Sequence, residues 1–320
     1  MHIAVIVYDG VFDSGLSAVL DVLDNANALG GQIHESSPTW NVTLVGPAPQ
    51  IRTGAGFLVA PEPLELADTA DLLVVPALAG SDPSVLLDHV GGEASLALRD
   101  LIARTRDRGA TIASACAGTF LLAEAGVLDG LRATTTWWLS PVFRDRYPKV
   151  ELDHSRMVIG CEGVITAGAA FGHVDLALAI VRAGSPALAD LVARYLVVDE
   201  RPSQAAYAIP SALAQSDPTV AAFERWTREH LAEPIRIPEA ASAIGVSERT
   251  LQRAVQRTVG TSPIRFVQDL RIERASHLLR TTDLSLETIS RKVGYEHPNT
   301  LRVLLRERTG KTTSALRGSR

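Results

Sequence analysis

Residues 238–263 read PEAASAIGVSERTLQRAVQRTVGTSP, and residues 286–313 read LETISRKVGYEHPNTLRVLLRERTGKTT. After their internal turns the two stretches keep one register, in which the matched pairs are Leu251 and Leu301, Val255 and Leu305, and Gly260 and Gly310. In the first stretch a short helix is expected to end at Gly245, because glycine readily adopts positive φ. Ser247 then offers a hydroxyl to cap a second helix. Each stretch therefore predicts a helix-turn-helix unit.

The second helix of each unit is expected to be two-sided. In the first unit, Leu251 and Val255 share one face at i, i+4 spacing, while charged and polar residues occupy the rest of the surface. Between the units, residues 264–280 carry apolar side chains in a helical rhythm, namely Phe266, Leu270, Ala275, Leu278 and Leu279. This central helix would fix the distance between the two units.

Five motifs carry a resemblance to a known family. They are Ser247-x-Arg249-x-Leu251-x-Arg253, Gly260-Thr261-Ser262-Pro263, Leu270-Arg271-Ile272-x-x-Ala275-x-x-Leu278-Leu279, Val293-Gly294-Tyr295 and Arg308-Thr309-Gly310. Together they resemble the DNA-binding domain of AraC/XylS-type transcriptional regulators, in which a central helix joins two helix-turn-helix units. The chain departs from the family at four positions. Val255, Leu301 and Leu305 stand where the family often has aromatic residues, and Thr313 stands where it often has proline. The three apolar substitutions keep apolar packing, so we still expect the family's fold. The resemblance implies double-stranded DNA as a partner.

The resemblance also implies that each second helix enters the major groove of DNA. The candidate contact residues are Arg249, Thr250, Gln252 and Arg253 in the first unit, and His297, Asn299, Thr300, Arg302 and Arg306 in the second. Long Arg and Gln side chains suit guanine and adenine edges. We expect the first unit to dominate sequence choice and the second to tune affinity.

The charge of the chain is unevenly distributed. The net charge is -5, but residues 216–320 hold 18 Lys+Arg against 12 Asp+Glu, and residues 1–215 hold 13 against 24. The basic end supplies counter-charge for phosphates, whereas the acidic end indicates that DNA does not wrap the whole molecule.

Length and composition predict two globular domains. A chain of 320 residues exceeds one ordinary domain. We expect an effector and dimerisation domain over 1–198, a linker over 199–218, where Pro and Ser break the periodicity, and a DNA-binding domain over 219–320.

The absence of a long apolar run or basic leader predicts a cytoplasmic protein without membrane contact. The two cysteines, Cys116 and Cys161, show no metal-ligand spacing, so we expect no metal and no cofactor.

The first domain alternates strand and helix patterns. Buried strands are predicted over 2–8, 40–46, 71–76 and 110–114, and helices over 16–29, 93–108 and 118–125. This alternation predicts an α/β fold with a doubly wound, mostly parallel, flavodoxin-like sheet, beside an all-α domain with the two helix-turn-helix units. Ligands of such sheets bind at the carboxyl ends of the strands.

The segment Ser114-Ala115-Cys116-Ala117-Gly118 has the small neighbours that a nucleophile elbow requires between strand and helix. It and three further segments, Leu121–Gly130, Ala133–Trp137 and Thr166–Ala169, resemble the ThiJ/PfpI-like branch of the class I glutamine amidotransferase-like superfamily. Regulators that couple this domain to an AraC-type end form a recognised, GlxA-type group, and the whole chain resembles that group. At the start of a helix, the amide dipoles would lower the pKa of the Cys116 thiol.

The elbow lacks the base that cysteine chemistry needs. Enzymes of the superfamily place a His soon after the elbow, but this chain has none between His89 and His154. Where related regulators often read Thr-Thr-His-Trp, Thr136 occupies the place of the His, and a hydroxyl is no base near neutral pH. For His173 we expect a satisfied core or capping role. We therefore expect a vestigial elbow and no enzymatic activity.

Three roles for Cys116 stay open, namely lining an effector pocket, sensing oxidation or electrophiles, and packing. We favour the first, with Asp9, Gly80, Cys116, Ala117, Thr136 and Trp137 as the pocket candidates. The sequence thus predicts a homodimeric transcriptional regulator whose first domain binds a small-molecule effector. The alternatives are a cysteine-dependent amidase, a glyoxalase-like hydrolase or a redox sensor, each fused to a DNA-binding domain.

Overall fold

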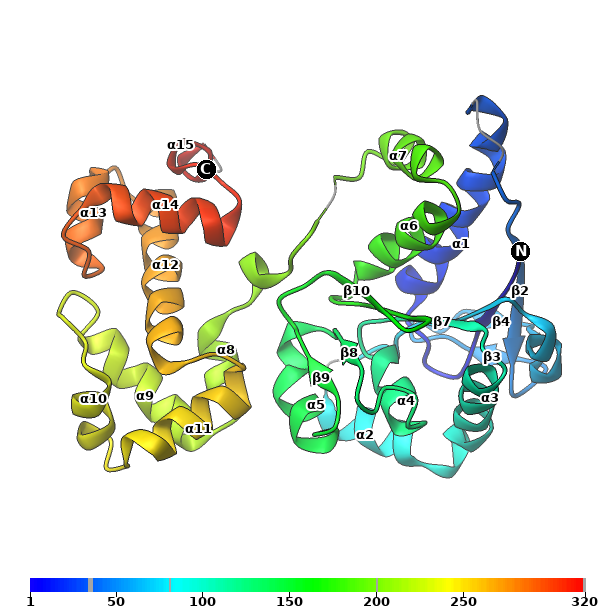
Figure 1. Ribbon diagram of the computed structural model, residues 1–320, viewed down its shortest axis with the longest axis horizontal. Helices are drawn as coiled ribbons and strands as arrows, with labels where there is room; N and C mark the ends of the chain where they lie inside the picture. Colours follow the sequence, from blue (N-terminus) through cyan, green and yellow to red (C-terminus); the bar gives the residue numbers. More distant parts are fainter. Residues whose placement is uncertain (34–36, 81, 200, 319–320) are drawn as a thin grey trace. The chain divides into compact units, whose positions relative to one another are not determined.

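The computed structural model describes residues 1–33, 37–80, 82–199 and 201–318. The chain divides into two compact units, Met1–Gln204 and Ala205–Arg320 (Figure 1). The boundary falls inside the segment expected as a linker, because Gln204 is buried in the first unit and the helix α8 (Pro210–Ala214) packs in the second. Residue 200 of that segment and residues 319–320 at the end of the expected second domain lie outside the described residues.

The first unit is built on a seven-stranded sheet. In spatial order its strands are β10 (Val158–Cys161), β11 (Val164–Ala167), β7 (Thr111–Ala115), β6 (Leu72–Val75), β1 (His2–Ile6), β2 (Asn41–Gly46) and β5 (Glu62–Pro63). Each neighbouring pair within the described residues is parallel, except β10 with β11. The order β2-β1-β6-β7-β11 is the flavodoxin-like order, so the predicted doubly wound sheet is confirmed.

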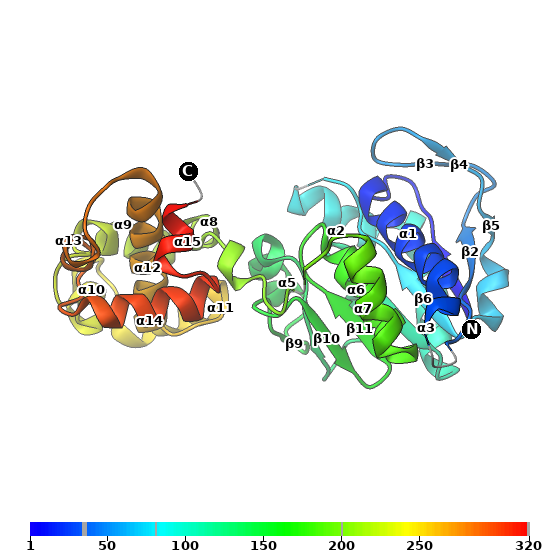
Figure 2. The same ribbon diagram turned by 90° about the horizontal axis from the view of Figure 1, so that it is seen from above.

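Helices cover both faces of this sheet (Figures 1 and 2). One face carries α1 (Asp13–Leu29), α6 (Gly172–Gly184) and α7 (Pro186–Tyr195), and the other carries α2 (Pro83–Gly91), α3 (Leu96–Asp107) and α4 (Gly118–Glu124). Because both faces are covered, the central strands β1, β6 and β7 are apolar and buried almost throughout. The helix expected over 93–108 begins instead as a short 3-10 turn, Glu93–Ser95, before α3.

Smaller elements complete the first unit. They are the helix α5 (Ser140–Arg146), the hairpin β3–β4 (Ile51–Arg52 and Leu58–Val59), the parallel pair β8–β9 (Arg132–Ala133 and Glu151–Leu152), and the 3-10 helices Gly30–Gln32, Leu64–Thr69 and Trp137–Leu139. The residues that follow β1, β6, β7 and β11 share one edge of the sheet, since these strands are parallel. That edge is where the elbow was predicted.

The second unit is all-helical, as predicted. After the 3-10 turn Ala205–Tyr207 and α8, its helices are α9 (Pro218–Glu229), α10 (Ile237–Ala243), α11 (Glu248–Val259), α12 (Pro263–Thr281), α13 (Leu286–Lys292), α14 (Pro298–Thr309) and α15 (Thr313–Arg317). The pairs α10–α11 and α13–α14 are the two helix-turn-helix units, and α12 is the central helix that joins them (Figure 1).

The two helix-turn-helix units are built alike. Gly245 and Gly294 occupy the two internal turns with φ of 77°, and Gly260 and Gly310 end α11 and α14 in the same left-handed region. A side chain is strained in this region, so glycine suits all four positions. The repeat read from the sequence is therefore a repeat of backbone conformation.

Candidate effector pocket and nucleic-acid interface

The predicted elbow is present at the end of β7. Cys116 has φ of 55°, in the left-handed region that non-glycine residues rarely adopt, and α4 starts two residues later. Gly118 allows the sharp turn, because a Cβ on it would lie 2.6 Å from the carbonyl oxygen of Val75. The amide of Cys116 donates a hydrogen bond to the carbonyl oxygen of Ala167 (2.8 Å), which ties the elbow to β11.

Burial opposes ionisation of the Cys116 thiol. Burial raises its pKa to about 12, although the amide of Ala117 and the hydroxyl of Thr136 act in the opposite direction. The predicted lowering of this pKa is therefore wrong. The reason is that Cys116 is 5% exposed, so loss of hydration of the thiolate outweighs the amides of the seven-residue helix α4.

His173 has a structural role. The amide of Ala77 donates to its Nε2 (3.1 Å), and its Nδ1 pairs with the carbonyl oxygen of Ala170 (2.7 Å), so the ring is neutral with Nδ1 protonated. Burial lowers its pKa to about 4. Both nitrogens are thus occupied, and the prediction of a satisfied core histidine is confirmed.

Two further aromatic side chains, Tyr8 and His89, lie near the elbow. The hydroxyl of Tyr8 donates to the carbonyl oxygen of Pro76 (2.7 Å), and burial together with the nearby Cys116 raises the pKa of Tyr8. The rings of Tyr8 and His89 lie 5.5 Å apart between centroids. Burial lowers the pKa of His89, which is therefore neutral at physiological pH. The contact between Tyr8 and His89 cannot be predicted from their spacing in the sequence, because the two residues lie on separate elements.

A pocket of about 290 Å³ opens beside the elbow. Its lining residues are Leu78, Ala79, Gly80, Asp82, Val85, Leu86, Ala117 and Leu139. Of the six predicted pocket residues, Gly80 and Ala117 line this space. Cys116 directly precedes Ala117 in the chain, and Thr136 lies three residues before the lining residue Leu139; both are buried and neither lines the pocket. The start of α2 supplies Asp82, Val85 and Leu86, which were not among the predicted pocket residues.

The other two predicted pocket residues have structural partners. The carboxylate of Asp9 accepts a hydrogen bond from the amide of Arg52 (2.9 Å), which holds the β3–β4 hairpin. Trp137 packs edge-to-face on Trp138 with centroids 5.7 Å apart, and its amide donates to the side chain of Gln204 (3.3 Å). Neither Asp9 nor Trp137 is part of the lining of this pocket.

The helix α11 has the two faces that the sequence predicts. Leu251 and Val255 are fully buried, whereas the four candidate DNA contacts, Arg249, Thr250, Gln252 and Arg253, are exposed. Within the described residues, neither Arg249 nor Arg253 forms an ion pair. Thr250 differs from the others, because its hydroxyl and amide both pair with the hydroxyl of Ser247, the N-cap of the helix.

The helix α14 repeats this arrangement. Leu301 and Leu305 are fully buried in a core with Ile289 and Leu316, while His297, Asn299, Thr300, Arg302 and Arg306 are exposed. The guanidinium of Arg302 donates to the side-chain oxygen of Asn299 (2.6 Å). Thr313 occupies the first position of α15 after the N-cap Thr312, the position that Pro263 has in α12, so the helix starts normally without proline.

Polar contacts fix the two recognition helices α11 and α14 on the rest of the second unit. Arg257 of α11 donates to the carboxylate of Asp217 (2.6 Å), which itself caps α9. Arg308 of α14 lies 3.5 Å from Asp269 of the central helix. Burial raises the pKa of Asp269 to about 6, so this group is ionised at neutral pH. Each recognition helix is therefore tied by an ion pair to a neighbouring element of the second unit.

Comparison with known proteins agrees with this geometry. A family model described as the DJ-1/PfpI family matches residues 1–183, and one described as a helix-turn-helix domain matches residues 240–319. The chain is 27% identical to the HTH-type transcriptional regulator CdhR of Pseudomonas aeruginosa, over 84% of this chain and 78% of the relative. It is 23% identical to the HTH-type transcriptional regulator GlxA of Rhizobium meliloti, over 88% of this chain and 85% of the relative.

A solved structure shows the same fold for the first unit. It is that of a putative transcriptional regulator protein from Vibrio parahaemolyticus, with a TM-score of 0.52 and 19% identity, over 61% of this chain and 98% of the other. The chain therefore belongs to the DJ-1/PfpI family, and its second unit is an AraC-type helix-turn-helix domain. It is a DNA-binding transcriptional regulator. Among its described residues, no helix combines the length and the hydropathy needed to cross a membrane.

Proposed function

We propose that a small molecule bound in the elbow pocket controls how the two helix-turn-helix units bind DNA. The observation that carries this proposal is the pocket of about 290 Å³ at the carboxyl ends of the parallel strands, beside a cysteine that is not activated. The carboxyl ends are where sheets of this kind bind ligands. The pocket is near the lower limit for drug-sized ligands, so the effector is a small metabolite.

The lining narrows the chemistry of the effector. Six of the eight lining residues have aliphatic side chains, namely Leu78, Ala79, Val85, Leu86, Ala117 and Leu139, and the one charged side chain among the described lining residues is that of Asp82. The hydroxyl and amide of Ser84 hold the pKa of Asp82 below its usual range, so the carboxylate is ionised at neutral pH. A neutral or positively charged metabolite with an apolar part fits this wall better than an anion.

We also propose that the elbow does not catalyse a reaction. Cysteine chemistry requires a thiolate and a base within hydrogen-bond reach. Thr136 stands in the position of the base, His173 has both nitrogens occupied, and the pKa of Cys116 is about 12. The same raised pKa makes a redox-sensing role for Cys116 unfavourable, because oxidants react with the thiolate.

For DNA, we propose that α11 and α14 enter successive segments of the major groove, about 34 Å apart along the duplex. Arg249, Gln252 and Arg253 would contact bases or phosphates in one segment, and His297, Thr300, Arg302 and Arg306 in the other. The hydroxyl of Thr250 is already paired with Ser247, so we assign Thr250 to helix capping more than to DNA contact. Asn299 and Arg302 would contact DNA as a hydrogen-bonded pair.

We further propose that the protein is a homodimer formed through the first unit. A dimer would place two copies of the paired units on one operator, which matches the two-fold symmetry of many regulator sites. Light scattering during size-exclusion chromatography measures the mass directly. A mass of one chain, 34.2 kDa, at micromolar concentration contradicts this part of the proposal.

The effector proposal is tested by thermal-shift screening of the full chain against neutral and cationic metabolites. A ligand at about one hundred times its Kd stabilises the folded protein by about 2.7 kcal/mol. The variant Ala117→Leu fills the pocket and should lose both this stabilisation and any effect of the compound on DNA affinity. The matched control is Ala94→Leu, an exposed position, which should keep both. Equal stabilisation of the wild type and Ala117→Leu would contradict the placement of the site.

A further inference from the structure

Gln204, the last residue of the first unit, is unusually placed for a residue beside a domain boundary. Its side chain is fully buried. The amide nitrogen Nε2 donates to the carbonyl oxygen of Thr135 (2.7 Å), and the oxygen Oε1 accepts from the amide of Trp137 (3.3 Å). A buried amide of this kind is stable only while both of its ends are paired. Gln204 is thus fixed to the segment 134–137.

The segment that holds Gln204 is the segment that holds the elbow. The hydroxyl of Thr135 donates to the carbonyl oxygen of Cys116 (2.7 Å), and the hydroxyl of Thr136 is buried and faces the thiol. The amide of Thr134 donates to the hydroxyl of Thr166 in β11 (2.9 Å). Two hydrogen bonds, both through Thr135, therefore join Gln204 to the residue that precedes the pocket residue Ala117.

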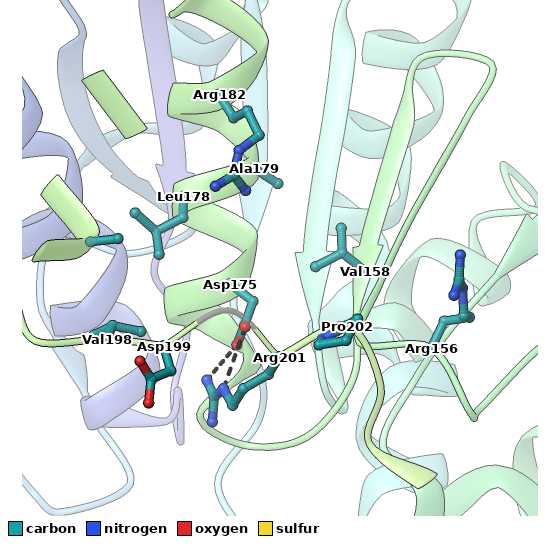
Figure 3. Close-up of a pocket in the computed structure, with 11 residues that line it drawn as sticks. Arg156, Val158, Asp175, Leu178, Ala179, Arg182, Val198, Asp199, Arg201 and Pro202 are labelled. Atoms are coloured by element: carbon teal, nitrogen blue, oxygen red, sulfur yellow. Dashed lines mark hydrogen bonds and ion pairs between the residues drawn. The ribbon is translucent and has the colours of Figure 1, made fainter. Parts of the chain in front are cut away.

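The residues before Gln204 form a strap across the first unit, which we define as residues 201–204. Arg201 pairs with the carboxylate of Asp175 on α6, and Figure 3 shows this side chain reaching across to it. At the other end the amide of Gln204 donates to the carbonyl oxygen of Ser155 (3.0 Å). Between these ends the carbonyl oxygen of Pro202 accepts from the amide of Met157 (3.3 Å) and the hydroxyl of Ser203 donates to the carbonyl oxygen of Ser155 (2.7 Å), so the strap is held along its length. Arg201 and Pro202 also border a pocket of about 250 Å³ between α6 and β10 (Figure 3).

The fit of Gln204 depends on a glycine. Gly168 follows β11, and a Cβ on it would lie 2.6 Å from Cδ of Gln204 and closer still to Nε2. The amide of Gly168 donates to the carbonyl oxygen of Met157 (2.7 Å), which fixes the glycine against the side chain. The absence of a side chain at Gly168 thus makes the space that Gln204 fills.

We propose that Gln204 is the positioning residue that couples the elbow pocket to the DNA-binding unit. An occupant of the pocket that displaces the lining residues Ala117 or Leu139 shifts the adjoining segment 134–137, which moves Gln204 and with it the chain that enters the second unit at Ala205. This inference rests on the proposed function. Because binding linkage is reciprocal, DNA binding to the second unit must change the environment of segment 134–137 through the same residue.

Reciprocity allows a test that needs no effector. The probe is a DNA duplex carrying an operator obtained by selection from random sequence with the full chain. Hydrogen–deuterium exchange of the full chain, with and without this duplex, should show a several-fold change in exchange at residues 133–138 of the wild type. Gln204→Leu, which has a similar volume but no polar atoms, should bind the duplex and lose this change. Gln204→Ala serves the same purpose if the leucine variant does not fold.

The control is Asp175→Asn, which weakens the Arg201 anchor without touching the elbow and should keep the change. The inference is overturned if wild-type exchange at 133–138 does not respond to DNA, or if Gln204→Leu and Gln204→Ala respond like the wild type. It is also overturned if Asp175→Asn abolishes the response, since the strap as a whole would then be responsible. Failure of the metabolite screen would instead contradict the proposed function. It would not affect the exchange results, because the exchange experiment uses DNA and no effector.

Discussion

The side chain of Gln204 lies directly against Gly168, in a space that a methyl group on the glycine would take up. Gly168→Ala should therefore displace Gln204 without altering it. The buried amide would lose its partners, so we expect a loss of about 1–3 kcal/mol in the free energy of unfolding of the first unit. Thermal melting of the full chain measures this loss, and hydrogen exchange at the Trp137 amide should rise with it.

The matched control for this substitution is Gly160→Ala. Gly160 lies in β10 with no atom close to the position of an added Cβ, so the substitution should change stability by no more than about 0.5 kcal/mol. If Gly168→Ala melts like Gly160→Ala and the exchange of Trp137 is unchanged, the close fit of Gln204 against Gly168 is not important for the fold.

The raised pKa of Cys116 predicts low reactivity of its thiol. In the variant Cys161→Ser, Cys116 is the remaining cysteine of the chain. With a pKa of about 12, its thiolate fraction should stay small at pH 8 and rise about tenfold for each pH unit up to that value. Iodoacetamide labelling of the folded protein, followed by mass spectrometry, should therefore be slow at pH 8. Rapid labelling at pH 7 would support an activated elbow and revive the alternatives of catalysis or redox sensing.

Shortening a buried side chain in the core of the second helix-turn-helix unit should lower the free energy of unfolding as much as it does in an ordinary domain. Leu305 is fully buried in α14, so Leu305→Ala should cost about 2–5 kcal/mol and reduce the affinity for DNA by loosening the recognition helix. Val303 lies on the same helix and is 55% exposed, so Val303→Ala should be nearly neutral. Circular dichroism melting compares the two. Similar melting of both variants would mean that α14 does not depend on this core.

Local signals in the sequence predicted most of the second unit. Glycines with positive φ, the N-cap Ser247, and the i, i+4 pair Leu251 and Val255 each act within one turn of a helix. Local chemistry therefore sufficed for the paired helix-turn-helix units. The sheet order was predictable for a related reason, since buried parallel strands alternating with helices allow few arrangements.

The parts that the sequence did not predict depend on contacts between distant residues. The pKa of Cys116 was misjudged because helix position alone suggested activation, whereas burial by other elements decides the shift. Gln204 was assigned to a linker because its neighbours are Ser, Ala and Pro, and its partners Thr135 and Trp137 are far away in the chain. Thr250 remains a predicted DNA contact, and the spacing of the sequence did not reveal that its hydroxyl pairs with Ser247.

The claim that both helix-turn-helix units read DNA is tested most directly by hydroxyl-radical footprinting of the full chain on its selected operator. We expect two protected segments centred about 34 Å apart. Arg253→Ala should weaken one segment and Arg306→Ala the other, by roughly 1–3 kcal/mol each where the arginine contacts a base. Arg194→Ala, an exposed arginine of the first unit, should leave both segments intact. A single protected segment that neither Arg253→Ala nor Arg306→Ala alters would contradict the account.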